Sequence, residues 1–281
     1  NTLVGPFPSM TLGKLDELTE FLKRILLCDF SEPKVYWKEY RRGPQYQNVP
    51  LQDLYDDLIL NPLWSTSNLD ELFCKSSDVV LTKQIVVPIK QSIHFLKDYS
   101  MNPYILHLVR DPRSILSSRQ NMMERDQIIN QNEIDQKLLN STLLCRNLKE
   151  NLHQVEIIKE QFPKRYLLVR YEDLTRETEF TILQILAWLD VQYNAKIATT
   201  IAVNTLGFAH PDAHEHLFST IRNTSHHHHA WRRHLGFNDV LSIQEECKDV
   251  MDGLGYRIYN TSAQYMDPDI HPVNPLPSGI L

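Results

Sequence analysis

A cation and several hydroxyls lie close together in the middle of the chain, at a spacing that could bind one anion. The residues concerned, in chain order, are Arg110, Asp111, Pro112, Arg113, Ser117 and Ser118. A guanidinium at a strand end and a hydroxyl two turns into the next helix can hold one phosphate, the first through its planar fork and the second as a donor. The same pattern also fits a plain helix cap with solvated serines, so spacing alone does not decide.

Local signals place these residues where a strand passes into a helix. Residues 104–109 are a short apolar run, and Asp111 followed by Pro112 is a helix start, because the carboxylate accepts the first amides and proline needs no donor there. At 100° per residue, the helix has an apolar arc and a separate polar arc. The apolar arc holds Ile115, Leu116, Met122 and Met123, and the polar arc holds Ser114, Ser117, Ser118 and Asn121. We expect the polar arc to be a row of hydroxyls facing away from the core.

The rest of the chain alternates in the same way. The expected helices cover residues 12–27, 89–96, 144–158 and 180–189, the last of them apolar nearly all round and therefore buried. The expected strands cover residues 79–87, 104–109 and 166–169. This alternation predicts an α/β fold with a mainly parallel sheet flanked by helices. We expect one domain over residues 1–262, and an extended proline-rich tail over residues 263–281.

Composition restricts the possible partners. With 29 Lys plus Arg against 35 Asp plus Glu, the net charge is −6, which argues against a broad nucleic-acid footprint. No apolar stretch approaches the ~18 residues of a membrane span. An even number of cysteines permits two disulfides, and the sequons at Asn140, Asn223 and Asn260 favour a lumenal or extracellular chain over a cytosolic one with buried thiols.

Several motifs together resemble one family. Residues 105–119, ILHLVRDPRSILSSR, look like the 3′-phosphate motif of the carbohydrate sulfotransferases, in which a serine follows the first arginine by eight residues. Residues 168–174, LVRYEDL, resemble a strand-end signature of the Golgi branch that sulfates 6-hydroxyls of N-acetylglucosamine, galactose or N-acetylgalactosamine. Residues 219–232 are similar to its late R-N-x-[ST]…A-W-R segment, and residues 246–256 to its closing helix and turn. All four cysteines fall where this branch tends to have them.

The resemblance implies a P-loop nucleotide-hydrolase-like sulfotransferase fold and a reaction. The sulfuryl group of 3′-phosphoadenosine-5′-phosphosulfate (PAPS) would pass to a sugar hydroxyl by in-line displacement, with no metal required. Arg110 and Ser118 would hold the 3′-phosphate, Arg222 would approach it from the late loop, and Trp231 would pack behind that loop. Arg113 would add charge or be a surface cation. The acceptor would be a glycan, while the general base and the oligomeric state stay unknown.

The sequence departs from the family pattern in two places. The family begins with a strand and an R-S-G-S-S-like loop that cradles the 5′-phosphosulfate, and no such sequence occurs here. We therefore expect the chain to be incomplete at its N-terminus, lacking that first strand and loop and a membrane anchor. The full-length form would be a type II protein of the Golgi lumen, and the piece alone would be inactive. Lys83 is a secondary candidate, because Val86 stands where the family has arginine.

Two other functions stay open on these residues. A noncatalytic glycan- or nucleotide-binding relative would also lack the 5′ loop. A nucleoside kinase or P-loop hydrolase is disfavoured, because no G-x-x-x-x-G-K-[ST] occurs. Residues 226–229 are four consecutive histidines, which point in different directions on a loop and predict an exposed insertion and no metal site. Arg170 and Glu172 are expected to form an ion pair that fixes loops.

Overall fold

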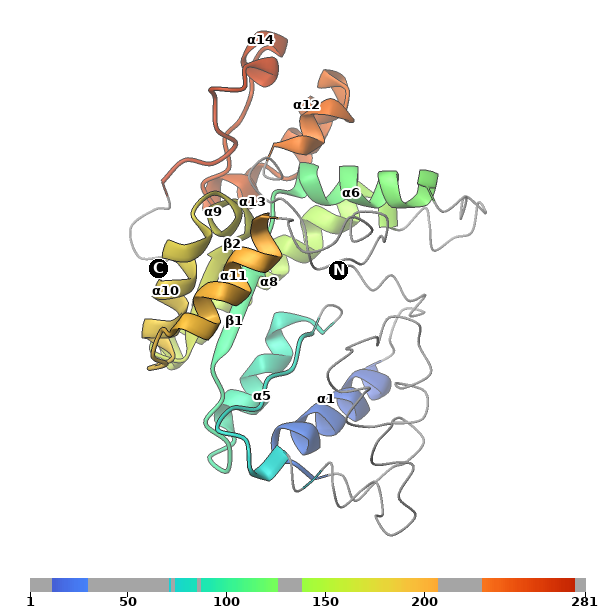
Figure 1. Cartoon of the computed structure of the whole chain (residues 1–281). Helices are drawn as coiled ribbons and strands as arrows, with labels where there is room; N and C mark the ends of the chain where they lie inside the picture. The colour runs from blue at the N-terminus through green and yellow to red at the C-terminus, as the bar shows by residue number, and fades with distance from the viewer. Residues whose placement is uncertain are drawn as a thin grey trace. The chain divides into compact units, whose positions relative to one another are not determined.

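The computed structural model describes residues 12–29, 71, 74–84, 87–125, 138–206 and 229–275. The chain divides into two compact units, residues 1–102 and 103–281. The first unit carries helices, and the second carries a small parallel sheet with the remaining helices (Figure 1). The described residues therefore form a mixed α/β arrangement, as predicted.

The first unit holds helix α1 (Leu12–Leu26), helix α5 (Ser92–Lys97) and a 3₁₀ turn, η1 (Ile89–Gln91), that leads into α5. Both predicted helices of this region are confirmed. Helix α1 ends with Cys28 in the left-handed conformation at φ 56°, and the amide of Asp29 donates to the carbonyl of Arg24 at 2.8 Å. A disulfide joins Cys28 to Cys74.

The predicted strand at residues 79–87 is wrong. Residues 79–84 are irregular, and the side chains of Val79 and Leu81 are 66% and 81% exposed. Within the described parts of the chain no strand pairs with this segment, so its backbone groups are not held in a ladder. Residues 85 and 86 lie outside the described residues.

The sheet of the second unit consists of two parallel strands, β1 (Ile105–Val109) and β2 (Tyr166–Arg170). Their register pairs Ile105 with Tyr166 and Val109 with Arg170, so both strands end side by side. Both strands were predicted. Helix α8 (Ser141–Gln161) lies in sequence between them, and Asn140 caps it by accepting from the amide of Leu143 at 2.7 Å.

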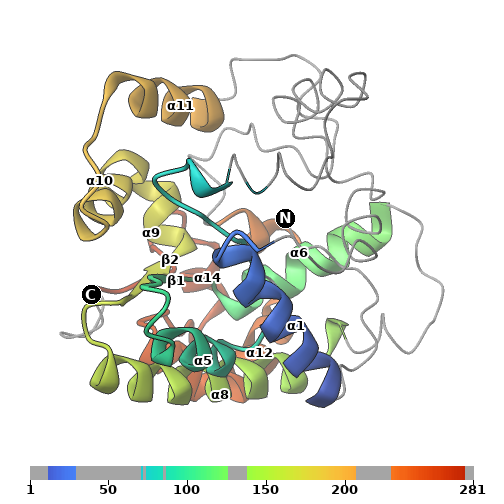
Figure 2. The same cartoon turned by 90° about the horizontal axis from the view of Figure 1, so that it is seen from below.

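Helices lie on both sides of the two strands, but one face of β1 stays open, because Leu106 and Leu108 are 46% and 52% exposed. Figures 1 and 2 place α8 on one side of the strands and α10 and α11 on the other. The remaining elements are α6 (Pro112–Arg125), α9 (Tyr171–Arg176), α10 (Thr178–Trp188), α11 (Ala195–Leu206), η3 (Ala230–Arg233), α12 (Phe237–Glu246), α13 (Lys248–Gly253) and α14 (Ser262–Met266). A second disulfide, Cys145 to Cys247, ties α8 to the junction of α12 and α13, so both cysteine pairs are oxidised. No helix in the described ranges is long and apolar enough to cross a membrane.

Two expectations about packing need correction. Helix α10 was expected to be buried, but Phe180 is 57% exposed, because α9 and α11 cover only part of the helix surface. The proline-rich tail was expected to be extended. Its described part instead begins with α14, where the ring of Tyr265 is buried and its hydroxyl donates to the carbonyls of Arg232 and Leu235. A buried ring with a satisfied hydroxyl holds this segment against the core.

Candidate anion site at the ends of the parallel strands

Arg110 follows β1 directly, and its guanidinium lies over an aromatic ring. Its guanidinium carbon lies 4.4 Å from the ring centroid of Tyr171, the first residue after β2. Its Nε atom is buried and has no hydrogen-bond partner. Among the described residues no carboxylate forms an ion pair with it. Nε of Arg119 and Nε of Arg232 are also buried without a partner, so it is this donor together with the place of Arg110 directly after β1 that suits it to an incoming anion.

The start of α6 has the predicted cap, in a buried form. Helix α6 begins at Pro112, and Oδ1 of Asp111 accepts from the amide of Arg113 at 2.9 Å. Asp111 and Arg113 are both fully buried. The interpretation of Arg113 as a surface cation or a ligand-facing charge is wrong, because its guanidinium points inward.

All three guanidinium nitrogens of Arg113 donate to protein groups. Its Nη2 forms an ion pair with Oδ2 of Asp111 at 2.7 Å, and its Nη1 donates to Oε1 of Gln244 at 2.8 Å and to the carbonyl of Arg257 at 2.9 Å. The rings of Trp231 and Tyr259 lie over it at 4.6 Å and 5.0 Å. Arg113 therefore fixes the start of α6 from behind.

The serines of α6 divide between core and solvent. Ser114 and Ser117 are buried, and Ser118 is exposed. The expected outward row of hydroxyls is therefore wrong for Ser114 and Ser117, because α8, α12 and η3 all pack on α6 and leave only a narrow open face. Ser118 lies six residues after Pro112, about 9 Å further along the axis, and its hydroxyl is open to solvent.

The predicted ion pair of Arg170 with Glu172 is replaced by other partners. Arg170 pairs with Asp173 at 2.6 Å and donates to the carbonyls of Leu254 and Asn274, each at 2.9 Å. Glu172 accepts from the amide of Asp111 and from the hydroxyl of Tyr256, each at 3.0 Å. The expected role in fixing loops is confirmed, through these different contacts.

Burial perturbs the carboxyl of Glu172. Desolvation, with a smaller contribution from the nearby Asp111 carboxylate, raises the pKa of Glu172 to about 7. The amide of Asp111 and the charge of Arg110 act in the opposite direction. Glu172 thus belongs to the same electrostatic cluster as the candidate anion site.

The other sequence candidates lie outside the described residues or in the first unit. Arg222 lies outside the described residues, as do three of the four consecutive histidines. Lys83 is exposed in the irregular segment of the first unit. No group of histidine, cysteine or carboxylate side chains suited to a metal ion occurs in the described portion of the chain.

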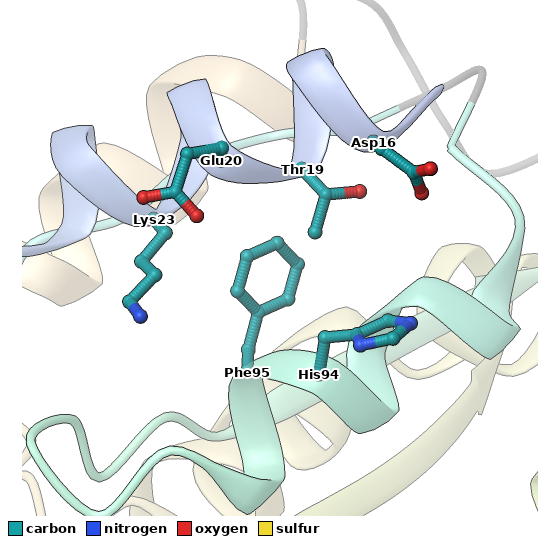
Figure 3. A pocket seen from close by; sticks show the side chains of 6 residues that line it. All are labelled: Asp16, Thr19, Glu20, Lys23, His94 and Phe95. Atoms are coloured by element: carbon teal, nitrogen blue, oxygen red, sulfur yellow. The ribbon is translucent and has the colours of Figure 1, made fainter. Parts of the chain in front are cut away.

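A hollow of about 300 Å³ lies between α1 and α5 in the first unit (Figure 3). Its lining includes the carboxylates of Asp16 and Glu20. The ammonium of Lys23, also in the lining, pairs with Asp98 at 2.5 Å, so it does not offset both carboxylates. An acidic lining disfavours a polyanionic nucleotide. The candidate anion site is therefore the end of the strands and not this hollow.

Sequence reasoning missed the residue under the guanidinium. Tyr171 was read only as part of LVRYEDL, although its place directly after a strand parallel to β1 puts it beside Arg110. Finding Tyr171 required knowing that the two strands pair and end side by side, and the sequence alone does not contain this information.

Comparisons with known proteins agree with the motifs. The model described as the sulfotransferase family matches residues 34–195, more than half of the chain. Carbohydrate sulfotransferase 4 of Mus musculus is 25% identical over 89% of this chain and 72% of its own length. Carbohydrate sulfotransferase 1 of Mus musculus is 27% identical over 70% of this chain and 49% of its own length. Carbohydrate sulfotransferase 6 of Homo sapiens is 31% identical over 68% of this chain and 51% of its own length.

The chain thus spans about half the length of the second and third of these relatives. No solved structure matches it. The family match covers the segment that contains β1, the Arg110 turn and β2. The chain therefore belongs to the carbohydrate sulfotransferase family.

Proposed function

We propose that the protein transfers the sulfuryl group of PAPS to the 6-hydroxyl of a hexosamine or galactose in a glycan. The observation that carries the proposal is the position of the Arg110 guanidinium. It lies at the carboxyl end of the parallel strands, over the ring of Tyr171, and its buried Nε has no hydrogen-bond partner. The names of the relatives, carbohydrate sulfotransferases 1, 4 and 6, support the chemical class. Residues 1–262 would form one sulfotransferase domain in a type II protein of the Golgi lumen.

Arg110 and Ser118 would hold the 3′-phosphate of PAPS, the group that distinguishes this donor from ATP. Arg110 can donate along its planar edge, and Ser118 can donate from the open face of α6. Arg222 would be a third contact. PAPS supplies the sulfuryl group, and positioning with cationic stabilisation provides most of the rate in such in-line transfers.

Arg110→Ala should remove the preference for a 3′-phosphate. We expect affinity for adenosine 3′,5′-bisphosphate to fall about 10- to 100-fold, because a charge-assisted hydrogen bond contributes about 1.5–3 kcal/mol. Adenosine 5′-monophosphate lacks the group, so its affinity should change less than about threefold. Isothermal titration of the full protein measures both. The matched control is Arg146→Ala, an exposed arginine of α8, and equal losses for both nucleotides in Arg110→Ala would contradict the site.

The acceptor is tested by transfer of labelled sulfate from PAPS to a panel of glycans. Product analysis should place the label on a 6-hydroxyl of N-acetylglucosamine, galactose or N-acetylgalactosamine. Binding of nucleotide without transfer to any glycan would instead support a noncatalytic relative.

Lumenal placement predicts an N-glycan on Asn140. This side chain is exposed, and its Oδ1 accepts from the amide of Leu143, so Nδ2 is the atom left for a glycan. Thr142→Ala removes the sequon but leaves Asn140 as the N-cap of α8. In protein made through the secretory pathway, this variant should lack the mass of one N-glycan that a glycosidase removes from the wild type. Asn147→Gln, at an exposed residue outside any sequon, should change nothing. Wild type and Thr142→Ala of identical glycan mass would contradict the placement.

A further inference from the structure

The turn between β2 and α9 lies against the turn between β1 and α6. Val109 and Arg170 are register partners at the ends of the two strands. Arg110 and Tyr171 are therefore the residues that directly follow the two adjacent strands. Helices α6 and α9 leave the same end of the sheet (Figure 1). The contact of Arg110 with Tyr171 follows from this pairing.

Fixed contacts hold the β2–α9 turn on both sides of Tyr171. Before it, Arg170 is tied to Asp173 at 2.6 Å and to the carbonyl of Leu254 at 2.9 Å. After it, the buried carboxyl of Glu172 accepts from the amide of Asp111 at 3.0 Å, so the two turns are joined directly. The ring of Tyr171 is thus attached to a rigid backbone.

A ring beneath a guanidinium restricts its orientation without using its donors. All five N–H bonds of arginine lie in the guanidinium plane, so a contact through the face leaves the edge free. Arg110 has such a face contact at 4.4 Å and an unpartnered Nε on its edge. A long side chain held in one orientation loses less entropy when it binds a phosphate.

We infer that Tyr171 is a positioning residue, whose ring aims the guanidinium of Arg110 at the 3′-phosphate of the donor nucleotide. This inference rests on the proposed function. Tyr171 acts through Arg110 and needs no contact with the nucleotide of its own. The aromatic ring is the required feature, and the hydroxyl is not.

The test is a double-mutant cycle of Arg110 and Tyr171. The measured quantity is the ratio of the affinities for adenosine 3′,5′-bisphosphate and adenosine 5′-monophosphate. We expect Tyr171→Leu to weaken binding of adenosine 3′,5′-bisphosphate about 3- to 20-fold, the range set by the rotamer entropy that a freed arginine side chain must lose on binding. Adenosine 5′-monophosphate should be unaffected, and Tyr171→Phe should bind like the wild type. Because Tyr171 acts through Arg110, the double variant Arg110→Ala/Tyr171→Leu should be no weaker than Arg110→Ala alone.

The possible outcomes distinguish failure of the positioning role of Tyr171 from failure of the proposed function. If Arg110→Ala removes the 3′-phosphate preference but Tyr171→Leu does not, the positioning role is wrong and the proposed function stands. An additive double variant, equal losses for both nucleotides, or a Tyr171→Phe as weak as Tyr171→Leu also overturns the positioning role. If Arg110→Ala leaves the preference intact, the proposed site fails and the inference fails with it.

Discussion

Asp111→Asn should lower the free energy of unfolding by about 3–5 kcal/mol, the usual cost of removing one partner of a buried ion pair. Asp111 and Arg113 are both fully buried, and their charged atoms are 2.7 Å apart. Asparagine keeps an oxygen for the amide of Arg113, so the helix cap survives. The guanidinium is left with the neutral partners Gln244 and the carbonyl of Arg257, which cannot replace the lost charge.

Denaturant unfolding with both disulfides intact measures this effect in the full protein. The matched control is Asp249→Asn, which removes an ion pair with Lys149 whose two side chains are each about two-thirds exposed. An exposed pair contributes about 0–1 kcal/mol, so this variant should be close to wild type. Equal and small losses in both variants would show that the Asp111–Arg113 pair does not stabilise the start of α6.

The contrast between these pairs also shows what the sequence could predict. Asp111 and Pro112 are neighbours, and a cap of this kind depends on local geometry, so the start of α6 was predicted at the right residue. The burial of Arg113 depends on Gln244, which is 131 residues away. No local pattern contains that information, so Arg113 was expected either to add charge to the anion site or to be a surface cation.

The same distinction separates the correct strands from the wrong one. Residues 79–87 and 104–109 are both rich in apolar residues, although Lys83 and Gln84 interrupt the first segment. A strand also needs a neighbour, and only β1 has one among the described residues. The cysteines behave similarly, because four cysteines permit three pairings and only the fold selects Cys28–Cys74 and Cys145–Cys247.

For the candidate site, the sequence located Arg110 correctly at a strand end. The family motif, and not periodicity, gave it a role, and the structure adds the unpartnered Nε that makes the role physically reasonable. The serines show the limit of helical-wheel reasoning. An arc of hydroxyls faces solvent only where no other element packs, and α12 and η3 approach α6 from more than 100 residues downstream.

Glu172→Gln should change how stability depends on pH. Burial raises the pKa of Glu172 from an ordinary 4.5 to about 7, which corresponds to about 3 kcal/mol. A raised carboxyl pKa means that the folded state binds the proton more tightly. The contribution of Glu172 to the free energy of unfolding is therefore fully present below pH 4.5 and is lost as the pH rises through 7. Glutamine cannot ionise, so the variant should gain about 3 kcal/mol relative to wild type between pH 4.5 and 8.

A second buried group masks this effect in the wild type. Burial lowers the pKa of His107 from 6.5 to about 4, and its Nδ1 lies 2.7 Å from the hydroxyl oxygen of Tyr166. The contribution of His107 to the free energy of unfolding is fully present above pH 6.5 and is lost as the pH falls toward 4. This pH dependence is opposite in sign to that of Glu172. The two contributions cancel in large part between pH 4.5 and 6.5, so the pH dependence of wild type alone is not informative.

The difference between variant and wild type removes the His107 contribution, because His107 is present in both. The matched control is the same substitution at an exposed carboxylate of α8, Glu160→Gln, which should change the free energy of unfolding little. A flat difference for Glu172→Gln would show that its carboxyl is not desolvated. In an Asp111→Asn background the Glu172 effect should shrink, because the Asp111 charge contributes to the raised pKa. The electrostatics behind the Arg110 turn thus act as one coupled cluster, and stability at different pH values can measure that coupling without any bound nucleotide.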